Sequence, residues 1–224
     1  LWSVWKGGKS KNAATLEDWA FLGDGLLELW QATGESHWLL GAIDFADQIL
    51  SRFAEPGTAT LRFSDKSCSD LFAQVVPLHD NATPSGNGVA ARLFAKLWHL
   101  TGNDTYRDRA EKIVSTCGEA LARFPRAYSS MLDAWRILSP NVLLAHLNGT
   151  PTDSDYQAMI ALLQRGPRTP DLMVPGSGAD LPGPLTKGFA GSHHTAGRAT
   201  VWVCRGTECL PPVHSASELE QLLG

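Results

Sequence analysis

The sequence predicts a mainly α-helical protein in which paired helices are followed by a small α/β unit. Three observations support this fold class. Apolar residues recur at helical spacing over residues 16–53 and again over residues 89–138. A short motif in that region recurs with a constant offset of 68 residues. After Ser139-Pro140, short apolar runs typical of strands alternate with helical segments. We therefore expect a helical-hairpin region over residues 1–138 and a small α/β unit over residues 139–224.

The first helices have recognisable ends. Residues 1–15 carry three lysines among glycine and serine, and we expect a loop there. A helix then begins after Thr15, which can cap it, and Asp18 three residues later completes a capping-box-like pair. Gly34 is expected to end this helix, and a second helix begins near Ser36. After it, residues 58–63 favour a short strand or an extended segment.

Three further helices are expected before the pattern changes. The third begins in the polar stretch 78–91 and ends at Gly102. A fourth runs from about Asp104 through Leu121, and a fifth covers residues 127–138.

An internal repeat relates the helices to one another. Leu29-Trp30, Thr33-Gly34, Trp38 and Ala42 correspond, at an offset of 68, to Leu97-Trp98, Thr101-Gly102, Tyr106 and Ala110. Two helices joined by a tight Thr-Gly turn, occurring twice, indicate stacked antiparallel hairpins. The alternative is chance, because such turns often follow amphipathic helices.

The C-terminal region predicts strands and helices in alternation. The expected elements are a strand at 141–147, a helix at 153–164, strands at 171–175 and 199–204, and a final helix at 218–223 capped by Ser217. The first two strands are expected to be parallel, because a helix connects them. Residues 175–198 are rich in glycine and proline and are expected to form a long surface loop.

Composition excludes several classes of function. The net charge of −4 and pI near 6.0 provide no electrostatic footprint for nucleic acid or an anionic membrane. No apolar run reaches the roughly 18 residues that a membrane span needs. Four scattered cysteines fit a reducing, cytoplasmic compartment, although the mitochondrial matrix would give the same pattern. The first residue is not methionine, and we expect the chain to start inside a larger protein.

The polar stretch 78–91 is the first candidate site. Asp80, Asn81, Thr83, Ser85 and Asn87 could direct hydrogen-bonding groups at one spot above a helix N-terminus. The alternative is an elaborate helix cap, for which one or two polar residues suffice. The 68-residue offset places Glu17 and Asp18 at the matching end of the matching helix, so both polar clusters are expected on one face.

Candidate roles follow from side-chain chemistry. Carboxylates and a histidine can act as general acid and base, and amides, hydroxyls and indoles can bind a sugar. The predicted catalytic residues are Glu17, His79 and Asp80, and the predicted ligand-binding residues are Trp19, Asn81, Ser85 and Asn87. Capping is the alternative role for both acidic residues of the first helix, and it is favoured for Asp18 because adjacent helical residues point about 100° apart.

Two other pairs of residues draw attention. Cys204 and Cys209 lack the two-residue spacing of a redox or zinc motif, and a disulfide, a thiol pair and simple packing remain open. His193-His194 lie in the Gly-rich loop without partner ligands, and neither a metal site nor a cofactor is predicted.

Three runs resemble one protein family. They are residues 16–22 (Leu-Glu-Asp-Trp-Ala-Phe-Leu), 80–87 (Asp-Asn-Ala-Thr-Pro-Ser-Gly-Asn) and 204–213 (Cys-Arg-Gly-Thr-Glu-Cys-Leu-Pro-Pro-Val). In this order they resemble the C-terminal part of the thioredoxin-domain-containing, spermatogenesis-associated family. The resemblance implies a partial (α/α)6 toroid of helical hairpins, similar to N-acylglucosamine 2-epimerase and six-hairpin glycosidases. It also implies that a thioredoxin-like domain and roughly half of the ring are absent from this chain.

Two functions follow as expectations. The first is a carbohydrate-binding or carbohydrate-active cleft, epimerase- or glycosidase-like, in the intact parent. The second is a non-catalytic structural or redox-partner module that serves the thioredoxin-like domain, for which Cys204 and Cys209 are the motivation. The expected partners are a small-molecule ligand and the missing N-terminal half. The exposed apolar sides of the helices in a half ring are expected to cause self-association or poor solubility.

Overall fold

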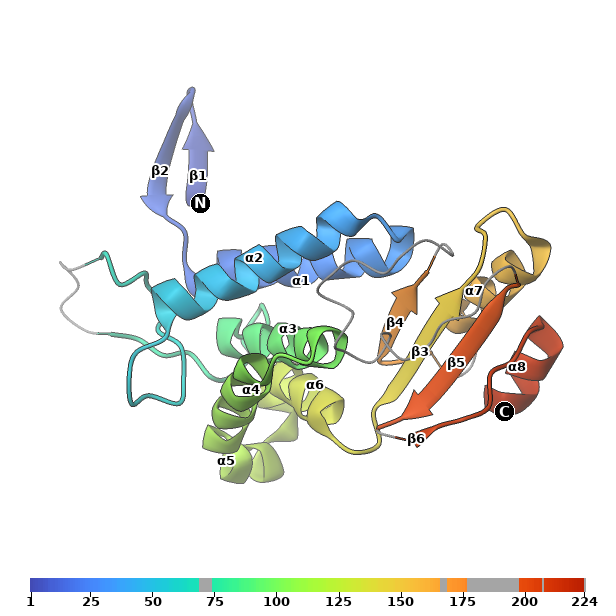
Figure 1. The fold of residues 1–224 in the computed structure, drawn as a ribbon. Coiled ribbons are helices and arrows are strands. Elements are labelled where there is room, and N and C mark those ends of the chain that lie inside the picture. Colours follow the sequence, from blue (N-terminus) through green and yellow to red (C-terminus); the bar gives the residue numbers. More distant parts are fainter. Residues whose placement is uncertain (69–73, 166–168, 177–197, 207, 224) are drawn as a thin grey trace. The chain divides into compact units, whose positions relative to one another are not determined.

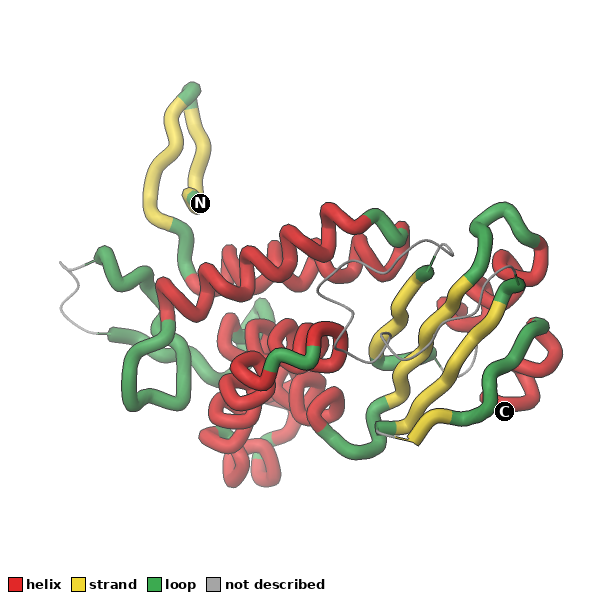
Figure 2. Tube along the Cα trace, viewed as in Figure 1, coloured by secondary structure: helices red, strands yellow, loops and turns green. Residues whose placement is uncertain are grey.

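The computed structural model describes residues 1–68, 74–165, 169–176, 198–206 and 208–223. The protein is mainly α-helical, with a small α/β part near the C-terminus (Figures 1 and 2). The chain forms two compact units. One comprises Leu1–Glu28, His37–Leu97 and Asp104–Leu138, and the other comprises Leu29–Ser36, Trp98–Asn103 and Ser139–Gly224.

The helical hairpins have the predicted repeat. Helix α1 (Leu16–Thr33) is followed by α2 (Ser36–Phe53), and α3 (Gly86–Thr101) is followed by α4 (Asp104–Thr116). Each turn contains a glycine with positive φ, +73° at Gly34 and +67° at Gly102, which an L side chain rarely adopts. The glycine N–H donates to the carbonyl oxygen of the tryptophan four residues earlier at 2.8 Å in both turns. The repeat in the sequence therefore corresponds to a repeat in the structure.

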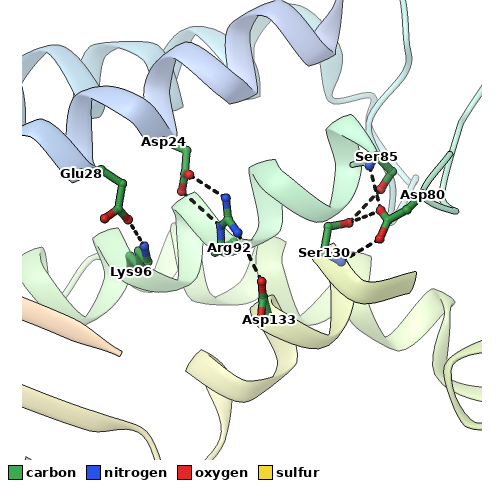
Figure 3. A network of polar contacts seen from close by, with 8 residues as sticks. All are labelled: Asp24, Glu28, Asp80, Ser85, Arg92, Lys96, Ser130 and Asp133. Carbon is green, nitrogen blue, oxygen red and sulfur yellow. Dashed lines mark hydrogen bonds and ion pairs between the residues drawn. The ribbon is translucent and has the colours of Figure 1, made fainter. Parts of the chain in front are cut away.

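Helices α1 and α3 run parallel. Asp24 on α1 pairs with Arg92 on α3, and Glu28 pairs with Lys96 one turn later (Figure 3). Both pairs are 68 residues apart. In an antiparallel pair of helices, Asp24 would instead meet Lys96. The repeat thus stacks equivalent positions beside each other, and both helices begin at the same end.

The prediction that residues 1–15 form a loop was wrong. Strands β1 (Trp2–Lys6) and β2 (Lys9–Ala13) form an antiparallel hairpin. Gly7 and Gly8 both have positive φ, as a type I′ turn requires. Two glycines between runs containing tryptophan and valine are a hairpin signal, and the polar character of the lysine-rich second strand concealed it.

The fourth and fifth predicted helices have different boundaries in the structure. Helix α4 ends at Thr116, before a separate short helix α5 (Gly118–Arg123). A 3-10 turn over Pro125–Tyr128 then precedes α6 (Ser129–Leu138). Pro125 has no N–H to continue a helix from α5, so a new helical segment begins there.

The strand predicted at 58–63 is reduced to one isolated bridge between Ala54 and Leu61.

The C-terminal sheet has the strand order β4-β3-β5-β6. Its strands are β3 (Leu143–Asn148), β4 (Leu172–Pro175), β5 (Thr200–Arg205) and β6 (Glu208–Cys209), of which β6 was not predicted. Strands β3 and β4 are parallel, as predicted, whereas β5 is antiparallel to both β3 and β6.

The helices of the α/β part cover one face of this sheet. Tyr156 and Met159 of α7 (Ser154–Arg165) and Leu219 of α8 (Ala216–Leu223) form a core with Ala145 and Val203 of the sheet. The cap of α8 is not Ser217 but Ser215, whose hydroxyl accepts the N–H of Glu218 at 3.3 Å. This serine stands three residues before a glutamate, which is the usual capping-box spacing.

The edge strand β4 is protected by a side chain. The Oε1 atom of Gln31, a buried residue on α1, accepts the Met173 N–H at 2.8 Å. An unpaired N–H on an edge strand would otherwise be open to pairing with another chain.

Most of the predicted loop 175–198 lies outside the described residues. Within the part that is described, no helix has both the length and the apolar character needed to cross a membrane.

Candidate functional site

Asp80 joins the beginnings of two helices. Its Oδ1 atom accepts the Ser85 N–H at 2.8 Å and also the Ser130 hydroxyl, and its Oδ2 atom accepts the Ser130 N–H at 2.8 Å (Figure 3). Ser85 directly precedes α3, and Ser130 lies in the first turn of α6. The carboxylate therefore satisfies N–H groups that have no partner within their own helices, and its charge complements both helix dipoles.

Ser85 and Gly88 determine how closely α3 and α6 approach. Ser85 is buried, and its Oγ atom accepts the Gly88 N–H at 3.0 Å, which makes it the N-cap of α3. A Cβ atom on Gly88 would lie 2.0 Å from the Ser130 Oγ atom. Only glycine fits there, so the two helix starts meet at this residue.

Asn87 is committed to the backbone of another segment. The residue has no exposed surface. Its Oδ1 atom accepts the Leu61 N–H at 2.8 Å, and its Nδ2 atom donates to the carbonyl oxygens of Leu61 at 3.0 Å and Pro77 at 3.2 Å. The amide thus takes the place of a neighbouring strand and fixes the chain around residue 61 to α3.

Asp18 closes the predicted capping box. Its Oδ2 atom accepts the Thr15 N–H at 2.8 Å and the Ser3 hydroxyl at 2.6 Å. Burial alone would raise the pKa of this carboxyl, but the hydrogen bonds from Ser3 and Thr15 outweigh it and leave the pKa below its ordinary value. The charged form is therefore favoured, and Asp18 also ties the β1–β2 hairpin to α1.

Glu17 lies where the starts of α1 and α3 meet. A Cβ atom on Gly86 would be 3.1 Å from the Glu17 Cγ atom, so the first turns of the two helices touch. Partial burial, with a smaller contribution from the charge of Asp18, raises the pKa of the Glu17 carboxyl. The Glu17 carboxyl is therefore easier to protonate than an ordinary glutamate.

Trp19, His79 and Asn81 have different surroundings. Trp19 is buried, with its ring centroid 5.1 Å from that of Phe45, and the Arg52 guanidinium lies 5.2 Å from the centroid of the Trp19 ring. His79 and Asn81 are exposed beside Asp80.

The structure brings most of the predicted site residues to one end of the helical unit. Glu17 and Ser85 stand at the starts of the parallel helices α1 and α3, and Asp80 connects the second of these to α6. Their assignments as catalytic or ligand-binding groups stay predictions. His193-His194 lie outside the described residues. Among the residues that are described, no group of three or more histidine, cysteine, aspartate or glutamate side chains is placed to hold a metal ion.

Sequence reasoning missed two features of this region. One is Ser130, which lies fifty residues from Asp80 in the chain and has no local signal. The other is the charged network of Asp24, Glu28, Arg92, Lys96 and Asp133 (Figure 3). The repeat could have predicted two of these ion pairs, because Asp24 and Arg92, and Glu28 and Lys96, are oppositely charged residues 68 positions apart.

We expect Asp80→Ala to lower the free energy of unfolding by about 2–4 kcal/mol, because three donors at two helix starts lose a charged acceptor. Urea denaturation followed by circular dichroism measures the loss. Asn81→Ala, at the exposed neighbouring residue, is the matched control and should change stability by less than about 0.5 kcal/mol. Equal effects of the two substitutions would contradict the structural role of Asp80.

The known proteins to which this chain is similar are much longer than the chain itself. No family model matches the chain. The chain is 25% identical over 211 residues to spermatogenesis-associated protein 20 of Mus musculus, covering 93% of this chain and 27% of the mouse protein. The protein of the same name from Rattus norvegicus is 26% identical over the same shares. An uncharacterized protein of Caenorhabditis elegans is 25% identical, with 96% of this chain and 29% of the relative aligned. The chain thus spans little more than a quarter of these proteins' length and is similar to spermatogenesis-associated proteins along most of its own.

Proposed function

We propose that this chain contributes to a carbohydrate-binding cleft in a helical toroid, with Glu17 as the acid/base group. The observation that carries the proposal is the half-buried Glu17 carboxyl with its raised pKa, located where α1 and α3 begin together. A raised pKa places a carboxyl closer to the range in which it can donate and recover a proton. The parallel stacking of α1 and α3, followed by α6, is the arrangement expected of successive inner helices of a toroid.

The other predicted residues have three different roles in this proposal. Asp80, Ser85 and Asn87 position the loop, since their polar atoms are used within the chain. His79 and Asn81 are exposed beside that loop and supply the histidine and amide groups that can meet sugar hydroxyls. Trp19 is buried against Phe45 and does not stack on the ligand in this proposal. No cofactor takes part.

A panel of neutral and N-acetylated sugars, titrated by calorimetry, tests this proposal. We expect at least one sugar to bind, and Glu17→Gln to weaken it by about 1.5–3 kcal/mol, because a hydrogen bond to an ionisable group is lost with little change in shape. Glu119→Gln removes the charge of an exposed glutamate on α5 and should leave affinity unchanged. Absence of heat with every sugar, or equal affinity for wild type and Glu17→Gln, would rule the proposal out.

A second candidate function is a structural module that docks another helical segment, expected to be the N-terminal part of a longer parent protein. The apolar residues Phe21 and Leu22 on α1 are 36% and 47% exposed. Their counterparts at an offset of 68 on α3, Val89 and Ala90, are 2% and 0% exposed. The same position in the repeat is thus covered on α3 and open on α1. A further helix stacked on α1 would bury these side chains as their counterparts on α3 are buried.

Self-association is the expected consequence of the open position on α1. We expect light scattering to show concentration-dependent oligomers of this chain, and Leu22→Gln to shift them toward monomers. Leu40→Gln, at an exposed leucine on α2, is the control and should have little effect. A monodisperse wild-type monomer at all concentrations would contradict this candidate function.

A further inference from the structure

A disulfide joins the last two strands of the sheet. Cys204 is the second-last residue of β5, and Cys209 is directly opposite it on the two-residue strand β6. The two sulfur atoms are bonded, and the bond links residues five apart in sequence. The spacing alone left a bond, a thiol pair and packing open, and the structure has the bond.

The two halves of this disulfide differ in access to solvent. Cys204 has no exposed surface, whereas Cys209 belongs to the exposed residues. A thiolate attacks a disulfide along the line of the bond and must reach the sulfur that it attacks. Access therefore favours Cys209 as the site of attack and Cys204 as the leaving group.

Strand β6 and the residues that follow it do not depend on the disulfide for their position. The Leu210 N–H donates to the Val203 carbonyl oxygen at 2.9 Å, and Val201 and Val213 exchange two backbone hydrogen bonds of 2.9 and 3.0 Å. The Gly206 N–H also donates to the Val142 carbonyl oxygen at 2.8 Å. These bonds remain when the sulfurs separate, so opening the disulfide leaves the sheet intact.

The disulfide also contributes little as a cross-link. The stabilisation that a disulfide provides through the unfolded chain grows with the length of the loop it closes, and this loop is very short. In the reduced state, Cys204 would be a protonated thiol on a buried strand, where cysteine packs as a small apolar residue. Reduction therefore creates no buried charge.

We propose that Cys204–Cys209 is a redox-active disulfide that exchanges with a dithiol reductant through Cys209. The thiolate of the reductant attacks Cys209 Sγ, the Cys204–Cys209 bond breaks, and Cys204 Sγ leaves with the electron pair and takes up a proton. The second thiol of the reductant then loses its proton and attacks the reductant sulfur of the mixed disulfide, and Cys209 Sγ leaves with the electron pair and takes up a proton. The protein gains two electrons and two thiols, and the dithiol becomes a disulfide.

A redox titration under native conditions tests the exchange. The chain is equilibrated in mixtures of reduced and oxidised dithiothreitol, quenched with acid, alkylated and mapped by mass spectrometry. We expect thiols at positions 204 and 209 to appear together while the far-UV circular dichroism stays constant. Opening of the bond only after unfolding in urea, or two thiols that stay reduced in oxidised dithiothreitol, would overturn the proposal.

Single variants test which sulfur reacts. Cys204→Ser leaves Cys209 alone, and Cys209→Ser leaves Cys204 alone. With an aromatic disulfide as probe, we expect Cys209 to react at least about tenfold faster than Cys204, because only the exposed thiol is accessible. The free and buried Cys117 provides an internal reference for a protected thiol in each sample. Equal rates, or a faster Cys204, would overturn the assignment, and the wild-type titration does not depend on how well these variants fold.

Discussion

The parallel register between α1 and α3 is the constraint on which the helical unit depends. Arg92 lies between two helices, with one guanidinium nitrogen 2.7 Å from Asp24 on α1 and another 3.3 Å from Asp133 on α6. Burial alone would lower the pKa of Arg92, but the negative charges of Asp24, Asp133 and Glu28 outweigh it and raise the pKa. Lys96, which is almost fully buried, is paired with Glu28. Asp24 and Glu28 can pair with Arg92 and Lys96 only if positions 68 apart stand side by side.

The register brings the starts of α1 and α3 together, and Asp80 attaches α6 at the same end. Helix starts present several N–H groups that have no partner within the helix. At the starts of α3 and α6, Asp80 and Ser85 accept hydrogen bonds from these N–H groups. The polar stretch around Asp80 is therefore first an internal cap. The same end also carries the Glu17 carboxyl, whose pKa is raised, in the first turn of α1, and the exposed loop residues His79 and Asn81.

Much of the fold was predictable because its signals are local. Apolar spacing and the two Thr-Gly turns located the paired helices, and the parallel order of β3 and β4 followed from the helix between them. The Gly7-Gly8 turn was equally local, but the lysines beside it suggested a loop. The partners of Asp80 and Asn87 could not be predicted, because Ser130 and Leu61 become neighbours only through packing. The residue types that suggested a binding site are also those that cap helices and replace strand neighbours.

Double-mutant cycles on the charged pairs test the parallel register most directly. Asp24→Asn with Arg92→Gln, and Glu28→Gln with Lys96→Met, remove the pairs that the register brings together. The crossed combinations, Asp24 with Lys96 and Glu28 with Arg92, are the pairs that an antiparallel stack would form. The register predicts coupling energies of about 0.5–3 kcal/mol for the first two cycles and smaller values for the crossed ones. Stronger coupling in the crossed cycles would contradict the parallel stacking of the repeat.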